Sequence, residues 1–592
     1  MGAVLSSIPA RLLFGLLLVG LYPGYRAISP KPLPGIPYNR DAAKKIFGDI
    51  PEVMSYVMKK KQIFCWLTSL TTRHQSPIVQ AFFKPGEWPW VVVTDPYESQ
   101  DILLRRTKEF DRTLFKEMIG GILPEQHSHY PSTDVHFKHN RNLINHLMAP
   151  TFISQVSARE VYNSVCTLIK VWQAKCDLAK GRPFSAHHDI TYAALDAIFA
   201  SSFGLPEQES NTIQRLKAVL EHAPQLNMSK DLNEPVEFPE GTIPTIFAAV
   251  LTIQDSATIT QMSPAPIFAS WILRKLPKMK KAIATKDQYI RDKVAKSVEL
   301  IEKAKATAQE QQQPTSALQS VLQREREVAE KEGRQPDYFK CAIADEFFGF
   351  TMAGHDTTAT ATAWGVKYLT DHPAAQETLR TALRRALPDA LAQQRSPTYQ
   401  ELIKAHVPYL DAVIEEITRH ANTIAFVARR AMLDTTVLGQ RIPKGTDVLL
   451  MANGPGYLEP NMRIAEDKRD GDAENAVMRS PGARPDGGKS LTSLWDDANI
   501  GAFKPERWLK RDPESGTERF DPMAGPNLAF GAGLRGCFGK KLALQALKLQ
   551  FALFVWNFRL LETPTELNSY DAVQKFAREP TQCYLRLERA DL

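Results

Sequence analysis

The 592-residue chain has few cysteines, and they show none of the spacings typical of a cysteine-rich scaffold. No two of them form a CxxC pair and no regular framework joins them, which disfavours both a disulfide-stapled fold and a zinc site. Unpaired thiols of this kind suit a reducing compartment. The six are Cys65, Cys166, Cys176, Cys341, Cys537 and Cys583.

The sequence also lacks long basic blocks and long low-complexity linkers. Lysine and arginine number 73 against 66 aspartates and glutamates, and the excess of seven is spread along the chain. This charge is too diffuse for a nucleic-acid-binding surface, so we expect no nucleic-acid partner. A hydrophobic content of 43% is ordinary for a globular protein with a sizeable core.

The N-terminus carries the one long apolar run, residues 12–21, with Arg11 before it and several basic residues after it. This pattern predicts a membrane anchor over residues 1–25, followed by a proline-rich hinge over residues 26–40 and a cytoplasmic body. A cleaved signal peptide is the alternative, against which the unpaired cysteines argue.

Hydrophobic periodicity predicts a mainly helical protein with small β-sheets, an α+β fold. Two apolar runs flank a Lys-Pro-Gly-Glu turn within residues 81–94 and predict a strand pair, followed by a helix after Asp95. Helical spacing dominates residues 142–385, and residues 341–369 predict one long buried helix. Residues 455–494 are polar, without periodicity, and predict a surface insertion.

Residues 530–539 read FGAGLRGCFG and place Cys537 among four glycines directly before an amphipathic helix. A thiolate at a helix start is stabilised by the helix dipole and by unpaired backbone N–H groups, which favours metal ligation. Glycines also let a flat cofactor approach the backbone. A buried, inert free cysteine beside a glycine turn is the plainer interpretation.

A polar interruption, AGHDTT at residues 353–358, lies inside the long apolar helix. Thr357 can bond back to the carbonyl one turn earlier, while Ala353 and Gly354 leave space beside the helix axis. This arrangement predicts a groove able to hold oxygen and water. A threonine that merely satisfies a neighbouring carbonyl is the alternative.

FGAGLRGCFG resembles the heme-binding signature of the cytochrome P450 family at every fixed position. The resemblance runs in motif order from about residue 30 to the C-terminus and is closest to eukaryotic microsomal, and especially fungal biosynthetic, members. It implies one catalytic domain over residues 41–592 that binds heme b. Cys537 would then ligate the iron, Phe530 and Gly531 would border its sulfur, and Arg535 would pair with a heme propionate.

The same resemblance implies roles for other motifs. On the long helix, Thr357 would hydrogen-bond dioxygen and Asp356 would relay protons, with Ala353 and Gly354 leaving room over the heme. The three-residue spacing of Glu416 and Arg419 is by itself compatible with a surface ion pair. The family pattern instead joins these two residues to Arg507, within FKPERW, in a buried structural network.

Further heme contacts are implied for Arg141 and for Arg429, with its neighbour Arg430 as the alternate, since only one of two adjacent residues in an extended segment faces inward. The chain departs from the family at two places. Asn422 stands where relatives usually have proline, and Phe137 stands where they often have tryptophan.

The activity implied is a monooxygenase that inserts one oxygen atom of O2 into a hydrophobic small molecule, in secondary-metabolite biosynthesis. Because no flavin or nicotinamide segment follows Cys537, electrons from NADPH would come through a separate cytochrome P450 reductase, with cytochrome b5 as a second candidate donor. The expected location is the endoplasmic reticulum membrane. The alternatives are a reductase-independent isomerase or dehydratase and a non-catalytic heme sensor.

Overall fold

The computed structural model describes residues 24–113, 121–226, 228–263, 265–306, 314–462, 495, 499–514 and 516–591. The chain divides into two compact units. The β unit comprises Met1–Thr113 and Phe426–Leu491, and the α unit comprises Leu114–Ala425 and Thr492–Leu592.

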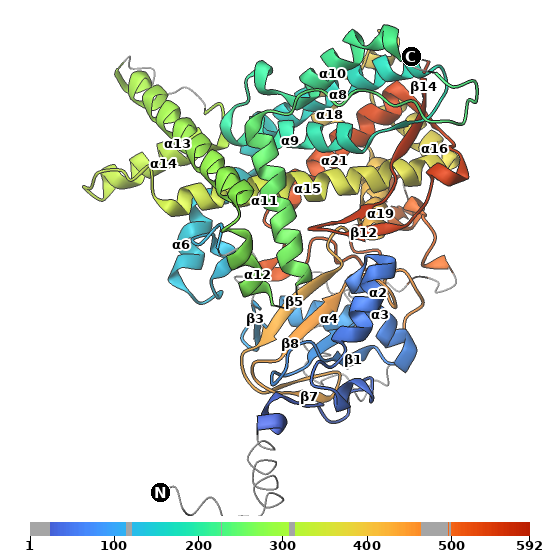
Figure 1. The fold of residues 1–592 in the computed structure, drawn as a ribbon. Helices are drawn as coiled ribbons and strands as arrows, with labels where there is room; N and C mark the ends of the chain where they lie inside the picture. The colour runs from blue at the N-terminus through green and yellow to red at the C-terminus, as the bar shows by residue number, and fades with distance from the viewer. Residues whose placement is uncertain are drawn as a thin grey trace, which may run out of the picture. The chain divides into compact units, whose positions relative to one another are not determined.

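The β unit is built on a five-stranded sheet of order β1-β2-β8-β5-β3 (Figure 1). Strands β2 and β8 are parallel, and the other neighbours are antiparallel. The unit contains α2 (Ile50–Lys60), α3 (Ile63–His74), β1 (Ile78–Ala81), β2 (Trp90–Val93), α4 (Pro96–Leu104), β3 (Phe110–Asp111), β5 (Phe426–Ala431), β6 (Thr435–Val437), β7 (Gln440–Ile442) and β8 (Asp447–Met451).

A strand pair around the predicted turn is confirmed, but its first strand lies earlier than predicted, at Ile78–Ala81, and shares only Ala81 with the predicted range of residues 81–94. Strands β1 and β2 pair antiparallel, with Ala81 opposite Trp90, around a loop whose Gly86 has a φ of 76°. Helix α4 then begins where Asp95 caps it, because the Asp95 carboxylate accepts the N–H of Glu98 at 2.8 Å.

The α unit is mainly helical. Its helices are α6 (Val135–Ile144), α7 (Pro150–Phe152), α8 (Ala158–Ala179), α9 (His187–Phe203), α10 (Asn211–Glu221), α11 (Thr245–Met262), α12 (Pro266–Leu273), α13 (Pro277–Ala306), α14 (Ala317–Lys331), α15 (Cys341–Asp371), α16 (Pro373–Ala386), α17 (Pro388–Ala392), α18 (Tyr399–Lys404), α19 (Pro408–Ala421) and α21 (Lys540–Asn557).

Short strands complete this unit. Strands β11 (Phe558–Leu561), β14 (Tyr584–Arg589) and β4 (Phe184–Ser185) form one sheet, whereas β9 (Leu509–Arg511) pairs with β10 (Glu518–Phe520) and β12 (Ala572–Gln574) pairs with β13 (Arg578–Pro580). The predicted mainly helical fold with small sheets is therefore confirmed.

Helix α15 forms the centre of the α unit and crosses it as one long helix (Figure 1). It packs against α9, α19 and α21, so most of its side chains are buried on every face. The packing is close at Gly365, where an added Cβ would lie 2.2 Å from Phe551 Cζ. The predicted helix over residues 341–369 is confirmed and extends two residues further, to the turn before Pro373.

A buried ion pair links α8, α9 and α10. Lys175 Nζ donates to both oxygens of Asp189, at 2.8 and 2.6 Å, and Arg215 Nε donates to the same carboxylate at 2.7 Å. Lys175 and Asp189 are fully buried. The Asp189 carboxylate is thus shared by the Lys175 ammonium and the Arg215 guanidinium. These buried contacts join the three helices.

Two sequence predictions lie largely outside the described residues. The proposed anchor, residues 1–25, is described only from residue 24, and the proposed insertion, residues 455–494, only to residue 462. In the described part of the chain, none of the helices is both long and apolar enough to span a membrane. The anchor, the hinge and the domain boundaries remain predictions.

Candidate heme and oxygen site

The loop over residues 530–539 folds around the sulfur-bearing residue. Gly531 and Gly533 adopt left-handed φ values of 59° and 69°, a conformation that glycine adopts without strain. The chain then returns so that the N–H of Cys537 donates to the Phe530 carbonyl at 2.7 Å. Helix α21 begins three residues later, and Cys537 is left exposed at the helix start.

Opposing effects act on the pKa of the Cys537 thiol. Crowding by protein atoms raises its pKa, whereas hydrogen bonds from the backbone N–H groups of Gly539 and Lys540, and the Lys540 ammonium, act in the opposite direction. The N–H donors are those that stabilise a thiolate, and a coordinating metal removes the thiol proton outright. This donor set, an exposed sulfur on a glycine loop with aligned N–H groups, fits a heme iron.

Arg535 attaches this loop to the segment before α6. Its Nε donates to Ser132 Oγ at 2.7 Å, its Nη2 donates to the Tyr130 carbonyl, and its guanidinium lies 4.0 Å from the centre of the Phe137 ring. The arginine is thus held at the edge of the loop. Its predicted pairing with a propionate remains a prediction.

Arg141 approaches the same loop from α6. Its Nη1 donates to the Leu534 carbonyl at 3.0 Å, and its guanidinium lies over the Phe538 ring at 5.5 Å. Phe530, on the other side of the loop, is half-buried with the Lys540 ammonium 5.6 Å from its ring centre. The structure therefore gathers Arg141, Arg535, Phe530 and Gly531 around Cys537.

The AGHDTT segment is the part of α15 at which one side of the continuous helix becomes exposed. Ala353 is exposed and Gly354 and Thr357 are half-buried, although the turns on both sides are buried. Thr357 Oγ1 donates to the Ala353 carbonyl at 2.8 Å, a bond that the groove prediction shares with the alternative of a threonine that merely satisfies a neighbouring carbonyl. Gly354 has a packing role, since an added Cβ would lie 2.9 Å from Ile198 Cδ1 of α9.

Asp356 lies on the buried side of the same turn. Burial raises its pKa to about 7, and the negative charge of Glu579 adds to the shift. Within the described chain, no group hydrogen-bonds its Oδ2 atom. A buried carboxyl with a pKa near neutrality and one unsatisfied oxygen is suited to exchanging a proton.

The Glu416 carboxylate is the centre of a buried network. Arg419 donates to it twice, at 2.9 and 2.8 Å, Trp508 Nε1 donates at 2.9 Å, and the Lys504 N–H donates at 2.8 Å. Arg507 Nε lies 3.7 Å away. Glu416, Arg419 and Arg507 are therefore brought together, and their surroundings exclude a simple surface pair.

Burial alone would raise the pKa of Glu416, but hydrogen bonds from His420 and Arg419 hold it well below its usual range. The carboxylate therefore stays charged below the pH at which an ordinary glutamate takes up a proton. Arg419 also donates to the Ile500 carbonyl at 2.9 Å, which ties α19 to the segment before Pro505–Trp508.

The two adjacent arginines of strand β5, Arg429 and Arg430, make different contacts. Arg430 lies opposite Asp447 of β8 and donates to both of its oxygens, at 2.7 and 2.8 Å. Arg429 is nearly buried, and its Nη1 donates to the carbonyl of Ala428 at 2.9 Å. Arg430 is thus engaged by a carboxylate, and the cofactor contact predicted for Arg429 remains a prediction.

Sequence reasoning missed several residues of these networks. Trp508 and His420 contact Glu416, and Gln254 contacts His355 from α11. Trp508 lay within the quoted FKPERW motif, so the motif itself was the available signal. Gln254 had no local signal, because its partner is 101 residues away in the sequence.

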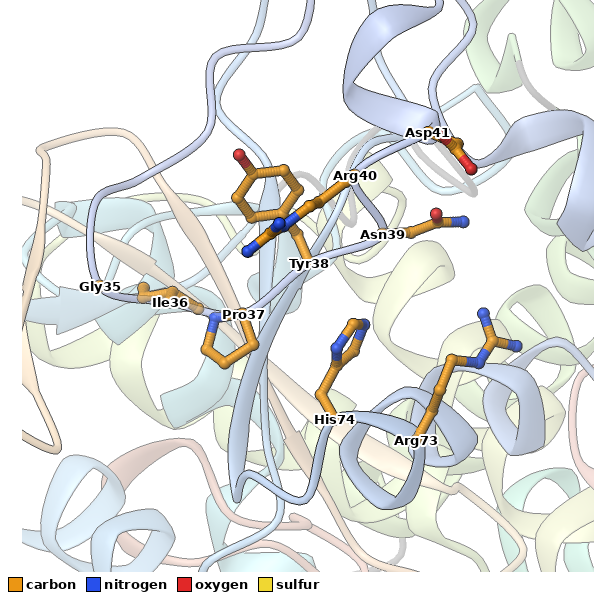
Figure 2. A pocket seen from close by; sticks show the side chains of 9 residues that line it. All are labelled: Gly35, Ile36, Pro37, Tyr38, Asn39, Arg40, Asp41, Arg73 and His74. Carbon is orange, nitrogen blue, oxygen red and sulfur yellow. The ribbon is translucent and has the colours of Figure 1, made fainter.

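A hollow of about 560 Å³ lies in the β unit, beside the hinge. Figure 2 shows His74 and Arg73 projecting from the end of α3 toward the segment that carries Tyr38 and Asn39. Burial lowers the pKa of His74, and Arg73 pairs with Glu52 at 2.8 Å. None of the site residues predicted from the sequence lines this hollow.

Comparison with known proteins agrees with this site. The family model described as "Cytochrome P450" matches residues 46–457 and 492–586, and the gap between them falls within the predicted insertion. Cytochrome P450 monooxygenase TRI13 of Fusarium sporotrichioides is 34% identical over 98% of both chains. Cytochrome P450 monooxygenase GME11363 of Pestalotiopsis microspora is 33% identical over 96% of both.

The fold is likewise similar to a solved structure. The cytochrome P450DA heme domain superposes with a TM-score of 0.63, at 15% identity, over 95% of this chain and 98% of that one. The chain belongs to the cytochrome P450 family. It is a heme-thiolate monooxygenase, an oxidoreductase that incorporates molecular oxygen.

Proposed function

We propose that this monooxygenase hydroxylates or epoxidises a hydrophobic small molecule of secondary metabolism, using electrons that a separate reductase takes from NADPH. The observation that carries the proposal is that one compact unit holds both an exposed cysteine on a glycine loop and a partly exposed, polar turn in an otherwise buried helix. The fungal monooxygenases to which the chain is similar support the biosynthetic role.

The Cys537 sulfur would hold heme, and the chemistry that bound heme supplies is the activation of dioxygen and transfer of one oxygen atom. The N–H groups of Gly539 and Lys540 would moderate the electron donation of the sulfur, as hydrogen bonds to a ligand atom do. Arg535 and Arg141 would hold the loop against α6 and offer charge to the propionates.

The proton needed for the reaction would come through α15. Asp356 keeps a proton up to about pH 7 because burial raises its pKa, and Thr357 lies next in the chain with its hydroxyl at the opened edge of the helix. The small Ala353 leaves this edge accessible. Surrounding apolar side chains exclude bulk water, so protons would arrive by defined groups.

The partners follow from the same proposal. A cytochrome P450 reductase, with cytochrome b5 as a second donor, would dock on basic side chains near the cysteine loop, and Lys540 and Lys541 are exposed there. Residues 1–25 would anchor the protein in the endoplasmic reticulum membrane. Both statements rest on charge and sequence pattern.

Reconstitution of the full chain with a reductase and NADPH in membranes tests the proposal. Hydrophobic compounds are screened for a change of heme spin state, and compounds that bind are then assayed for an oxygenated product that carries label from ¹⁸O2. Product without reductant would indicate an isomerase or dehydratase. Ligand binding with no product from any binding compound would indicate a sensor.

A further inference from the structure

AGHDTT contains His355, to which the proposed function gives no role. Its side chain is fully buried in α15. The ring nitrogen Nδ1 lies 3.0 Å from the Thr351 carbonyl oxygen, and Nε2 lies 2.8 Å from Gln254 Oε1 on α11. Both ring nitrogens are therefore in hydrogen bonds, and their partners determine which nitrogen donates and which accepts.

Burial lowers the pKa of His355 to about 4, so the ring is neutral at physiological pH. A neutral imidazole has one donor nitrogen and one acceptor nitrogen. The Thr351 carbonyl can only accept, hence Nδ1 carries the proton and Nε2 accepts. Two acceptors cannot bond each other, so the Gln254 amide must be turned end for end, which brings its NH2 to Nε2, since the two ends of an amide are assigned from such networks.

As placed, Gln254 also donates its NH2 to Asp356, a bond that by itself lowers the pKa of that carboxyl. If the NH2 of Gln254 is turned to His355, the carbonyl oxygen of Gln254 is the end left for Asp356. A carbonyl oxygen repels a carboxylate but accepts a hydrogen bond from a carboxylic acid. The chain of bonds is then consistent only with a protonated Asp356.

We propose that Gln254 and His355 are positioning residues that keep the Asp356 carboxyl in its protonated, donating form beside Thr357. The direction of the hydrogen bonds runs from Asp356 to Gln254, from Gln254 to His355 and from His355 to Thr351. The effect on turnover rests on the proton-relay role proposed for Asp356, whereas the protonation state itself does not. This chain of hydrogen bonds contains one mobile proton, and Asp356 carries it.

Charged groups around Asp356 from the neighbouring elements do not impose the opposite state. On the β12–β13 hairpin, Lys575 Nζ pairs with Glu579 Oε2 at 2.7 Å, so their effects on Asp356 oppose each other. Asp255 of α11 acts on the same lysine, and His187 of α9 lies 3.9 Å from Glu579. The Ala577 backbone N–H also bonds Asp356 and lowers its pKa, so burial and the turned Gln254 amide are the two effects that favour the protonated form.

A reversed arrangement has the same number of protons and makes the opposite prediction. In it, His355 is an imidazolium, Gln254 turns its carbonyl to His355 and its NH2 to Asp356, and Asp356 is a carboxylate. Removing His355 would then remove a cation and raise the pKa of Asp356. In the arrangement we propose, removing His355 frees the Gln254 NH2 to bond Asp356 and lowers that pKa.

Infrared titration of the full-length heme protein distinguishes the two. The carboxylic acid C=O band of Asp356, assigned by its loss in Asp356→Asn, is followed against pH in the wild type and in His355→Phe. We expect a band that persists to about pH 7 in the wild type and titrates at least one pH unit lower in His355→Phe, a tenfold weaker proton affinity. An unchanged or raised titration in His355→Phe overturns the proposal.

The matched control is His146→Phe, because His146 is another histidine whose burial lowers its pKa to about 4, bonded to Ser320 away from this helix turn. Its substitution leaves the Asp356 band unchanged. Should His355→Phe fail to fold, the wild type and Asp356→Asn decide alone, because absence of an Asp356 band at pH 6 contradicts the proposal.

Turnover separates this inference from the proposed function. If the relay role holds, the alkaline fall in product formed per NADPH moves to lower pH in His355→Phe by the same amount as the infrared titration. If the band shifts while Asp356→Asn leaves product per NADPH unchanged, the hydrogen-bond assignment stands and the relay role of Asp356 fails.

Discussion

Replacing Glu416 by glutamine tests whether its buried network holds the fold around the cysteine loop. The side chain has no exposure, and the substitution puts an NH2 group where Arg419, Trp508 and the Lys504 N–H now donate. The Arg419 guanidinium, 1% exposed, would lose its counter-charge. Removing one partner of a buried pair costs about 3–5 kcal/mol, a large part of a typical stability of about 5–15 kcal/mol.

The neighbouring Glu415 provides a matched control, because it is also buried but pairs with none of the arginines in the part of the chain that the structure describes. Burial raises the pKa of Glu415, and Asn527 Nδ2 donates to its Oε1 atom at 2.7 Å. Glutamine retains an oxygen for Asn527 and removes the cost of burying a charge. Glu415→Gln should therefore stay within about 1 kcal/mol of the wild type at neutral pH, or exceed it.

The two carboxyls also predict opposite responses to pH. The lowered pKa of Glu416 means that its contribution to stability is present above the unfolded pKa and is lost as pH falls toward the folded one. The raised pKa of Glu415 means that its contribution is lost as pH rises through the folded value. Glu416→Gln should therefore weaken the acid sensitivity of stability, and Glu415→Gln should weaken the alkaline loss.

The assay is urea unfolding of each full-length protein from about pH 3, below the unfolded pKa of a glutamate, to pH 8, followed by tryptophan fluorescence and by heme absorbance. Glu416→Gln should unfold at the lower urea concentration by both signals. Equal losses in the two variants, or a loss below about 1 kcal/mol in Glu416→Gln, would refute the reasoning that charge compensation in this network stabilises the fold.

Three further substitutions have expected outcomes. Thr357→Val removes the hydroxyl at the opened turn and should lower product per NADPH while NADPH oxidation continues; an unchanged ratio would contradict the role given to Thr357. Lys175→Met leaves the buried Asp189 with less compensation and should cost about 3 kcal/mol in urea unfolding, whereas a neutral result would show that the ion pair does not stabilise the helices. Gly365→Ala would place a methyl group 2.2 Å from Phe551 Cζ and should cost about 1–3 kcal/mol in the same assay, with wild-type stability as the contrary result.

Local signals explain why much of the fold could be predicted. The Pro-Gly turn before β2 and the Asp95 cap of α4 act over a few residues, so the strand pair and the following helix were readable from sequence. Helix α15 was equally readable because buried helices are apolar on every face. Its end could be placed only to within two residues, where Pro373 follows.

Contacts between distant segments explain what could not be predicted. The spacing of Glu416 and Arg419 placed both on one helix face, but burial and the approach of Trp508, 92 residues away, required the folded chain. The choice between Arg429 and Arg430 depended on strand register, since only the pairing with β8 places Asp447 opposite Arg430.

The hydrogen-bond polarity around Asp356 is a second case of this kind. The AGHDTT motif predicts that Asp356 and Thr357 carry protons, yet it contains nothing that specifies a partner for His355. That partner, Gln254, is supplied by the packing of α11. Sequence patterns thus predict where the chemistry lies, whereas the groups around the predicted site are given by tertiary structure.

The central claim is that the Cys537 sulfur ligates heme iron, and a carbon monoxide difference spectrum of the reduced full-length protein tests it most directly. We expect the red-shifted Soret band of a thiolate-ligated heme, lost in Cys537→Ala and retained in Cys341→Ala, a control that removes another exposed cysteine. A purified protein without heme, or a Soret band that survives Cys537→Ala, would contradict the account.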